Sequence, residues 1–316
     1  MFRYSIVFAA LLSAQAALSA SATLSPGVIV DLDVGAAFAI DREGRTQRVS
    51  LASGAIGWIS GEQSFPLALA DGRLVALGAT SVAGSATLLV IDPANGKLVD
   101  RVSIDLPESV SASFFPNPSQ RFTATVLDTP EGVRVFWRHE QRALRGAAIE
   151  ELDQNGELSI NPTTVHIGTF DLVIDNRRYY AVPVLGTLDE PNMLPLALAD
   201  AERLPEQAGV QYRAADNNDV MTSQATPDDI FGSIYRWSVF DRQGKRIGGY
   251  RSPYAFAPFV VNADTLLIRE QPLEYRNALG ESQSRLARIA CIELSTGSER
   301  WAFNVLDQQY RGPMPP

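Results

Sequence analysis

The side chains that could perform acid–base or metal chemistry are few in this chain of 316 residues. His139 and His166 are its only histidines, and neither belongs to a pair with metal-ligand spacing such as H-x-x-x-H. The sequence contains no G-x-S-x-G elbow and no glycine-rich phosphate loop. A Ser-His-Asp triad is assembled in space, and nothing in the sequence supports one. We expect both histidines to be structural, on the surface or hydrogen-bonded, and we predict no catalytic residue.

Carboxylates are the other candidate ligands. Asp31 and Asp33 alternate along an expected strand, Asp216 and Asp219 enclose two asparagines, and Asp228-Asp229 follows soon after. Oxygen ligands of this kind could hold calcium, but none of the spacings matches an EF-hand. Solvated loop acids are the alternative. We therefore predict no metal site and no cofactor.

Cysteine content and net charge restrict the compartment and the partners. Cys291 is the only cysteine, so no internal disulfide can form. It lies in an apolar run, which indicates a buried, inert thiol rather than a nucleophile or a dimer bridge. The formal net charge is −9, and an acidic surface repels phosphate backbones. We expect a protein or peptide partner and no nucleic acid.

The N-terminus is typical of a secretory signal peptide. Arg3 supplies a positive start, residues 6–18 are mostly apolar, and Ala20-Ser21-Ala22 has the small-x-small form of a cleavage site. An uncleaved N-terminal anchor is the alternative. No later run reaches the length of a transmembrane helix. Because secreted animal proteins of this size usually carry several cysteines, we expect a periplasmic or secreted bacterial protein.

One form of turn recurs five times between expected strands. Each opens with Asp or Glu, continues with small polar residues and ends with Gly. The acidic or Asn side chain bonds its own backbone, and Gly takes the positive φ that closes the turn. Hairpins repeated at spacings of tens of residues indicate a β-propeller. The turns are Asp41–Gly44, Asp92–Gly96, Asp153–Gly156, Asp241–Gly244 and Glu293–Gly297.

Alternating apolar residues predict strands throughout the mature chain. The clearest unit spans residues 65–106 and contains four strands in about 40 residues, the size of one propeller blade. The last unit repeats this order with a hairpin at 259–268 and a second hairpin from 287 to 305. The only helix candidate after the signal is 196–207, which Pro195 and Pro205 crowd.

The spacing of the turn glycines predicts the number of blades. Successive turn glycines lie 52, 60, 88 and 53 residues apart, and the longest gap, from Gly156 to Gly244, has room for two blades. A degenerate blade there, using residues 172–184 and 194–199, gives a single all-β propeller of about six four-stranded blades, with five to seven possible. A strand near residues 28–34 would complete the final blade and close the ring, which protects the sheet edges. A β-sandwich with coincidental turns is the alternative.

The last unit resembles the repeat of the PQQ-like (quinoprotein-like) β-propeller superfamily. That repeat is a strand, Asp, two residues, Thr-Gly and a Trp that packs between blades; here Trp301 follows Gly297 by four residues, and Glu293 replaces the Asp. The resemblance implies propeller architecture over residues 28–305 in a short, divergent, exported member. The eight-bladed dehydrogenases of the family are longer, and shorter periplasmic members act as scaffolds. The same offset in the other units holds Arg48, Asp100, Ile160 and Gly248.

These observations predict three segments and one leading function. Residues 1–22 are the signal peptide, 23–307 the propeller and 308–316 a Pro-rich tail. The low-pattern stretch 189–232 is either a partner-contacting insertion or an excursion with no role. A stiff ring that presents loops and carries few reactive side chains favours a non-enzymatic binding or scaffold protein. The alternatives are a small enzyme (a hydrolase, lyase or quinoprotein-like oxidoreductase) with its site in the funnel, and a structural subunit of an envelope assembly.

Overall fold

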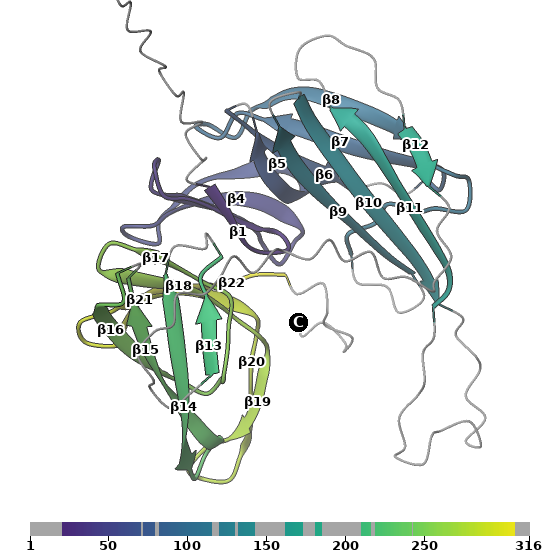
Figure 1. The fold of residues 1–316 in the computed structure, drawn as a ribbon. Helices are drawn as coiled ribbons and strands as arrows, with labels where there is room; N and C mark the ends of the chain where they lie inside the picture. Colours follow the sequence, from purple (N-terminus) through teal and green to yellow (C-terminus); the bar gives the residue numbers. More distant parts are fainter. Residues whose placement is uncertain are drawn as a thin grey trace, which may run out of the picture.

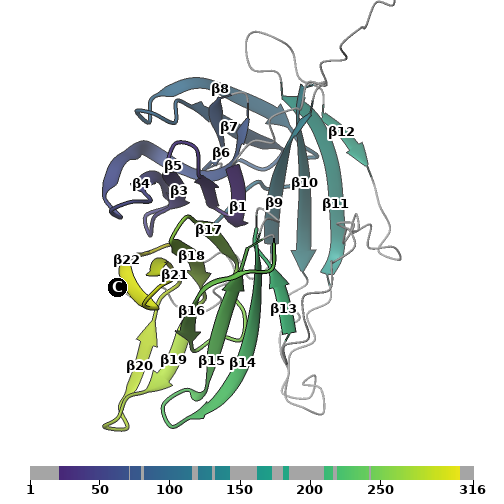
Figure 2. The same ribbon diagram turned by 60° about the vertical axis from the view of Figure 1, so that its left-hand side comes forward.

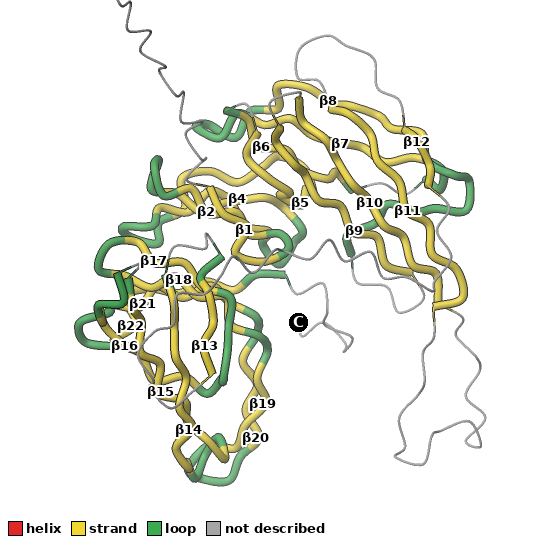
Figure 3. Tube along the Cα trace, in the orientation of Figure 1, coloured by secondary structure: helices red, strands yellow, loops and turns green. Residues whose placement is uncertain are grey.

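The protein is built from antiparallel β-strands. The computed structural model describes residues 21–70, 72–79, 82–115, 120–129, 132–142, 162–172, 181–184, 210–215, 219–241 and 243–306. All 22 regular elements in these ranges are strands, as the alternating sequence predicted (Figure 3). Within the same ranges, no helix is long and apolar enough to cross a membrane.

The first eight strands pair in chain order, and one long strand joins two sheets. Strand β5 (Ile56–Ala70) pairs with β4 through residues 56–63 and with β6 through residues 64–70. The second sheet reproduces the predicted unit at 65–106 strand by strand. The first sheet holds β1 (Ser21–Ser25), β2 (Val28–Asp31), β3 (Ala36–Ile40) and β4 (Arg45–Ser50), and the second adds β6 (Arg73–Gly78), β7 (Ser85–Ile91) and β8 (Leu98–Asp105) to β5.

Three further four-stranded sheets follow (Figures 1 and 2). The third has the order β12-β11-β10-β9: β9 (Gln120–Thr129), β10 (Gly132–Arg142), β11 (Pro162–Leu172) and β12 (Ala181–Val184). The fourth has β13 (Val210–Arg213), β14 (Val220–Asp228), β15 (Gly232–Phe240) and β16 (Arg246–Ser252). The fifth has β17 (Phe259–Asn262), β18 (Thr265–Glu270), β21 (Arg288–Glu293) and β22 (Ser298–Asn304), and the hairpin of β19 (Leu273–Arg276) and β20 (Ser282–Arg285) is inserted between β18 and β21.

Four of the five recurrent turns lie within the described residues, and each joins the third and fourth strands of its sheet. The turn glycines adopt φ values of +80°, +74°, +76° and +72°, which L side chains rarely adopt. Each glycine N–H donates to the carbonyl of the acidic residue that opens the turn, at 2.7–3.1 Å. The pairs are Asp41 with Gly44, Asp92 with Gly96, Asp241 with Gly244 and Glu293 with Gly297. Asp153 and Gly156 lie outside the described residues.

Three interpretations of strand pairing are wrong. Residues 28–31 pair with β1 and β3 in the first sheet, so they do not complete the last one. Residues 181–184 pair with β11, so Leu172 and residues 181–184 belong to the third sheet and not to a separate degenerate blade. The segment 189–232 contains β13 and β14, so its described part is not an irregular excursion. In all three, strands pair with their neighbours in the chain, and local composition carries little information about which strands pair.

The number of blades and closure of the ring stay predictions. The described residues hold five four-stranded sheets, and no apolar cluster among them joins the third sheet to the fourth. Residues 194–199, the helix candidate 196–207 and the tail 308–316 lie outside the described part of the chain, as do residues 1–20 of the expected signal peptide. Strand β1 begins at Ser21, two residues before the expected mature start at Thr23.

Apolar clusters connect neighbouring sheets. One cluster joins the second and third sheets, another the first and fifth, and another the fourth and fifth. Trp301 of β22 marks the seam between the fifth sheet and the first, because its indole N–H donates to the carbonyl of Leu51 at 3.2 Å. A Cβ on Gly54 would lie 2.6 Å from Cγ of Trp301, so this turn fits the indole only without a side chain. Trp301 therefore packs between two sheets.

Candidate functional site

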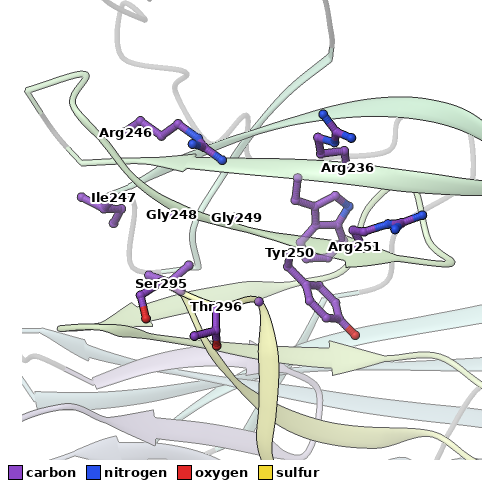
Figure 4. A pocket seen from close by; sticks show the side chains of 12 residues that line it. Arg236, Arg246, Ile247, Gly248, Gly249, Tyr250, Arg251, Ser295 and Thr296 are labelled. Carbon is purple, nitrogen blue, oxygen red and sulfur yellow. The ribbon is translucent and has the colours of Figure 1, made fainter.

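An open groove runs between the edge strand of the fourth sheet and the last recurrent turn of the fifth (Figure 4). We call it the arginine groove and define it by residues 236–237 of β15, 246–251 of β16 and 294–297 of the turn. Its volume is about 500 Å³, within the range of pockets that take organic ligands.

Two consecutive glycines allow the sheets to meet at the groove. A Cβ on Gly248 would lie 2.4 Å from the carbonyl oxygen of Leu294, and a Cβ on Gly249 would lie 2.5 Å from the carbonyl oxygen of Trp237. The N–H of Gly249 donates to the carbonyl of Leu294 at 3.2 Å. Glycine inside a strand commonly marks such a close backbone approach. The glycine pair therefore lets the turn of the fifth sheet dock on β16.

Trp237 and Tyr250 alternate with Arg236 and Arg251 along their strands, so the aromatic side chains lie on the opposite face of β15 and β16, packed against the fifth sheet. Trp237 is fully buried, and its ring meets that of Tyr250 edge to face with centroids 5.8 Å apart. The indole N–H donates to the carbonyl of Tyr254 at 3.0 Å. Burial, and then the nearby Glu270 carboxylate, raise the pKa of Tyr250 well above its usual value. Tyr250 is therefore a neutral phenol at physiological pH.

A buried carboxylate of the fifth sheet contacts Tyr250 and keeps it in place. Glu270 of β18 has no exposed surface and accepts hydrogen bonds from Nε of Arg288 at 2.5 Å and from the Tyr250 hydroxyl at 3.3 Å. Nη2 of Arg285 lies 3.3 Å from the same carboxylate. The charge is thus paired with two guanidiniums, as a buried carboxylate requires. This cluster fixes the position of Tyr250 and leaves Glu270 inaccessible to a ligand in the groove.

Three exposed arginines surround the opening. Arg236 of β15 and Arg251 of β16 are directly opposed in the antiparallel register, so their side chains share one face of the sheet. Nη2 of Arg246 lies 3.1 Å from where a Cβ of Gly249 would be, which places its guanidinium over the glycine pair (Figure 4). In the part of the chain that the structure describes, none of the three lies within ion-pair distance of a carboxylate.

One acid lies on the neighbouring strand. The pKa of Asp228 is lowered first by the backbone N–H groups of Phe231 and Ile230, which donate to its Oδ1 at 3.0 and 2.9 Å, and less by the charge of Arg251. Asp228 therefore caps its own turn and is not a partner dedicated to Arg251. The arrangement leaves three cationic side chains on one face of β15 and β16 and uncharged aromatic rings on the other, which suits the cationic face to hold an anion.

A second, smaller pocket lies among strands of the first three sheets. It has a volume of about 130 Å³ and lies between β1, β5, β6 and β9. Its lining is mainly apolar, with Phe65, Leu67 and Phe122 beside threonines. Among the described residues that line it, no side chain is ionisable.

The structure places the two histidines at directly opposed positions of β10 and β11. His139 lies within β10 and is fully buried, so of the two expected alternatives, surface or hydrogen-bonded, the surface position does not apply to it. Cys291 is a free, fully buried thiol on β21, as expected, and burial raises its pKa.

The structure does not bring the acidic candidates together into a metal site. Asp31 ends β2, and its carboxylate accepts the backbone N–H of Asp33 at 3.0 Å within a turn, so the two acids do not alternate on one strand as expected. Asp228 caps a turn, and Asp216 lies outside the described residues. No cluster of three or more His, Cys, Asp or Glu side chains with metal-binding potential occurs in the described ranges.

Sequence reasoning missed the arginine groove. Its residues come from three segments within residues 236–297, and only the fold brings them together. The available signal was local: a Gly-Gly pair inside an expected strand, flanked by Arg246 and Arg251. Paired glycines in a strand indicate close approach of another backbone or a ligand.

Comparison with known proteins assigns no family. No protein-family description and no curated protein matches the chain. Solved structures with a related arrangement include BamB from Moraxella catarrhalis, with 10% identity over 83% of this chain and 77% of that one and a TM-score of 0.23. The β-propeller domain of Cps50 (Swd1) from Myceliophteria thermophila has 11% identity over 88% and 85%, with a TM-score of 0.27.

Hydrazine synthase from Kuenenia stuttgartiensis is also similar, with 10% identity, a TM-score of 0.26 and 84% of this chain covered. The present chain spans 62% of the length of that one. At TM-scores this low, none of the three carries an argument about this chain, whose fold is therefore described from its own strands.

Proposed function

We propose that the chain is an exported, non-enzymatic β-propeller of the bacterial periplasm that binds a protein or peptide partner in the arginine groove. The single observation that carries this proposal is the groove itself: three exposed arginines on one face of β15 and β16, whose opposite face is packed against the fifth sheet. Binding sites set on rigid elements hold their contact groups in place before the ligand arrives.

The recurrent turns and the Trp301 seam support the propeller and its PQQ-like repeat. Each described turn closes the outer hairpin of a four-stranded sheet, and Trp301 packs between two sheets as in that repeat. Periplasmic export rests on the pattern of residues 1–22. A ring of sheets presents its turns on a stiff platform, which favours a scaffold.

A small enzyme with its site in the funnel remains the alternative function. The groove offers little acid–base chemistry, because its phenol is neutral and its nearest buried carboxylate is enclosed by arginines. No observation among the described residues of the smaller pocket favours a particular reaction.

The test is mass spectrometry of the protein purified gently from the envelope of cells that produce it, under native and then denaturing conditions. We expect a mature chain that begins near Thr23, together with a stoichiometric protein or peptide partner. A monomer that carries a small organic molecule or calcium would favour the enzyme instead. A bare monomer under all mild conditions would contradict the scaffold proposal.

A further inference from the structure

We infer that the arginine groove recognises an acidic segment of a protein partner, whose carboxylates are held by Arg236 and Arg251. This inference rests on the proposed function and specifies its ligand. The first step is the register: Arg236 and Arg251 are direct cross-strand partners, and like charges at such positions repel each other. An anion between them would convert this repulsion into two attractions.

Among the described residues, Asp228 is the acid that interacts with this group through the charge of Arg251, and its carboxylate caps its own turn instead of forming an ion pair. Arg246 brings a third guanidinium over Gly249, on the face that Arg236 and Arg251 share. No carboxylate of the described chain lies within ion-pair distance of the three. The protein as a whole is acidic, with a net charge of −9, so this group of three arginines has the opposite sign to the net charge of the chain. Charge complementarity therefore points to an anionic ligand from outside the chain.

The dimensions and chemistry of the groove favour a peptide segment over a single small ion. Its volume of about 500 Å³ exceeds the needs of one phosphate, and it follows six consecutive residues of β16. Arginine forks bind carboxylates through paired hydrogen bonds. Between the guanidiniums and the turn, Ile247 and the glycine backbone offer contacts to an extended chain.

The test measures binding of fluorescein-labelled hexaglutamate to the full mature protein by fluorescence anisotropy, with hexaglutamine as the neutral peptide. We expect hexaglutamate to bind and hexaglutamine not to bind. We expect the affinity to fall when sodium chloride is raised from about 50 to about 200 mM, because exposed charges are screened. The double variant Arg236→Gln/Arg251→Gln should weaken binding about tenfold or more.

Arg73→Gln is the matched control. It removes one positive charge from β6, in the second sheet, and should leave the affinity within about twofold, since any effect of net charge alone is small. Arg236→Lys/Arg251→Lys keeps both charges but removes the forks, so it should bind with intermediate affinity. The lysine double variant also tests the inference if the glutamine double variant fails to fold. The circular dichroism spectrum of the glutamine variant would reveal such a failure.

Three results would overturn the inference: equal binding of the two peptides, an unchanged affinity in both double variants, or displacement of hexaglutamate by inorganic phosphate at equal molar concentration. The last would assign the groove to a small oxyanion. If a partner co-purifies with the native protein but hexaglutamate does not bind, the inference fails while the proposed function stands.

Discussion

Glu270 is the buried carboxylate that keeps Tyr250 in place beneath the groove strands. It is fully buried between Arg285 and Arg288, and it accepts a hydrogen bond from Tyr250. Glu270→Gln leaves Arg285 without its carboxylate partner among the described residues, and leaves Arg288 with Glu299 alone. We expect the free energy of unfolding to fall by about 2 kcal/mol, below the range for a fully enclosed pair because Arg285 and Arg288 keep some exposure. Urea unfolding measures this.

Glu274→Gln serves as its control. Glu274 is exposed on β19 and forms no ion pair with another described residue, so its loss should change stability by less than about 0.5 kcal/mol. Equal effects of the two substitutions would show that the buried cluster contributes nothing specific.

Tyr250 makes the stability of the protein depend on pH in the alkaline range. Burial raises the pKa of its phenol in the folded state, so above about pH 10 the unfolded chain loses this proton before the folded chain does. The stability that the phenol contributes is complete below that pH and is lost as the pH rises further. Tyr250→Phe should flatten this alkaline decline in urea unfolding at pH 9 to 11. An identical decline in the variant would refute the assignment.

At the scale of elements, the contact between Trp301 and the turn at Gly54 joins the last sheet to the first. Gly54→Ala places a methyl group against the indole and also strains a positive φ of 71°. Gly72→Ala is a matched control, because its φ of 67° is similar and nothing lies within 4 Å of the added Cβ. We expect about 1 kcal/mol of destabilisation for Gly72→Ala and about 2 kcal/mol or more for Gly54→Ala, measured by thermal unfolding. Equal destabilisation by Gly54→Ala and Gly72→Ala would mean that the Trp301 indole shifts away from the added methyl group at no energetic cost.

The same scale explains which parts of the fold the sequence predicts. The unit at 65–106 and the hairpins of the last sheet are local: apolar alternation defines their strands, and Asp-to-Gly turns connect neighbours. Strand β14 was missed because it lacks apolar alternation: it is rich in polar residues, and Thr222 and Ser223 among them are buried. Strand β12 was misassigned because the sequence pattern did not identify β11 as its partner. The arginine groove was missed for a related reason, because Arg236 meets Arg251 only through the register of two strands.

At the scale of the whole molecule, the reactivity of the Cys291 thiol measures whether the sheets are folded. It is the only thiol of the chain, it is fully buried in β21, and burial raises its pKa, so little thiolate is available. We expect Ellman's reagent to label it only after unfolding, with one equivalent per chain and a rate that follows the urea transition. Rapid labelling of the native protein would contradict the packing of the fifth sheet.

The seams connect the sheets in the order third, second, first, fifth, fourth, and the groove lies on the last of them, between the fourth and fifth sheets. A partner held there contacts two sheets at once, so the rigidity of the whole array contributes to binding. The central claim is that this groove receives a protein or peptide partner.

The most direct test of that claim is site-specific photocrosslinking in the native envelope. A photoreactive phenylalanine derivative is placed at Thr296, in the groove, and at Asn95, which precedes the equivalent turn glycine in the second sheet. Both positions are exposed and have the same place in their turns. We predict a discrete adduct from Thr296, lost in Arg236→Gln/Arg251→Gln, and none from Asn95. Equal adducts from both positions, or none from Thr296, would contradict a binding role for the groove.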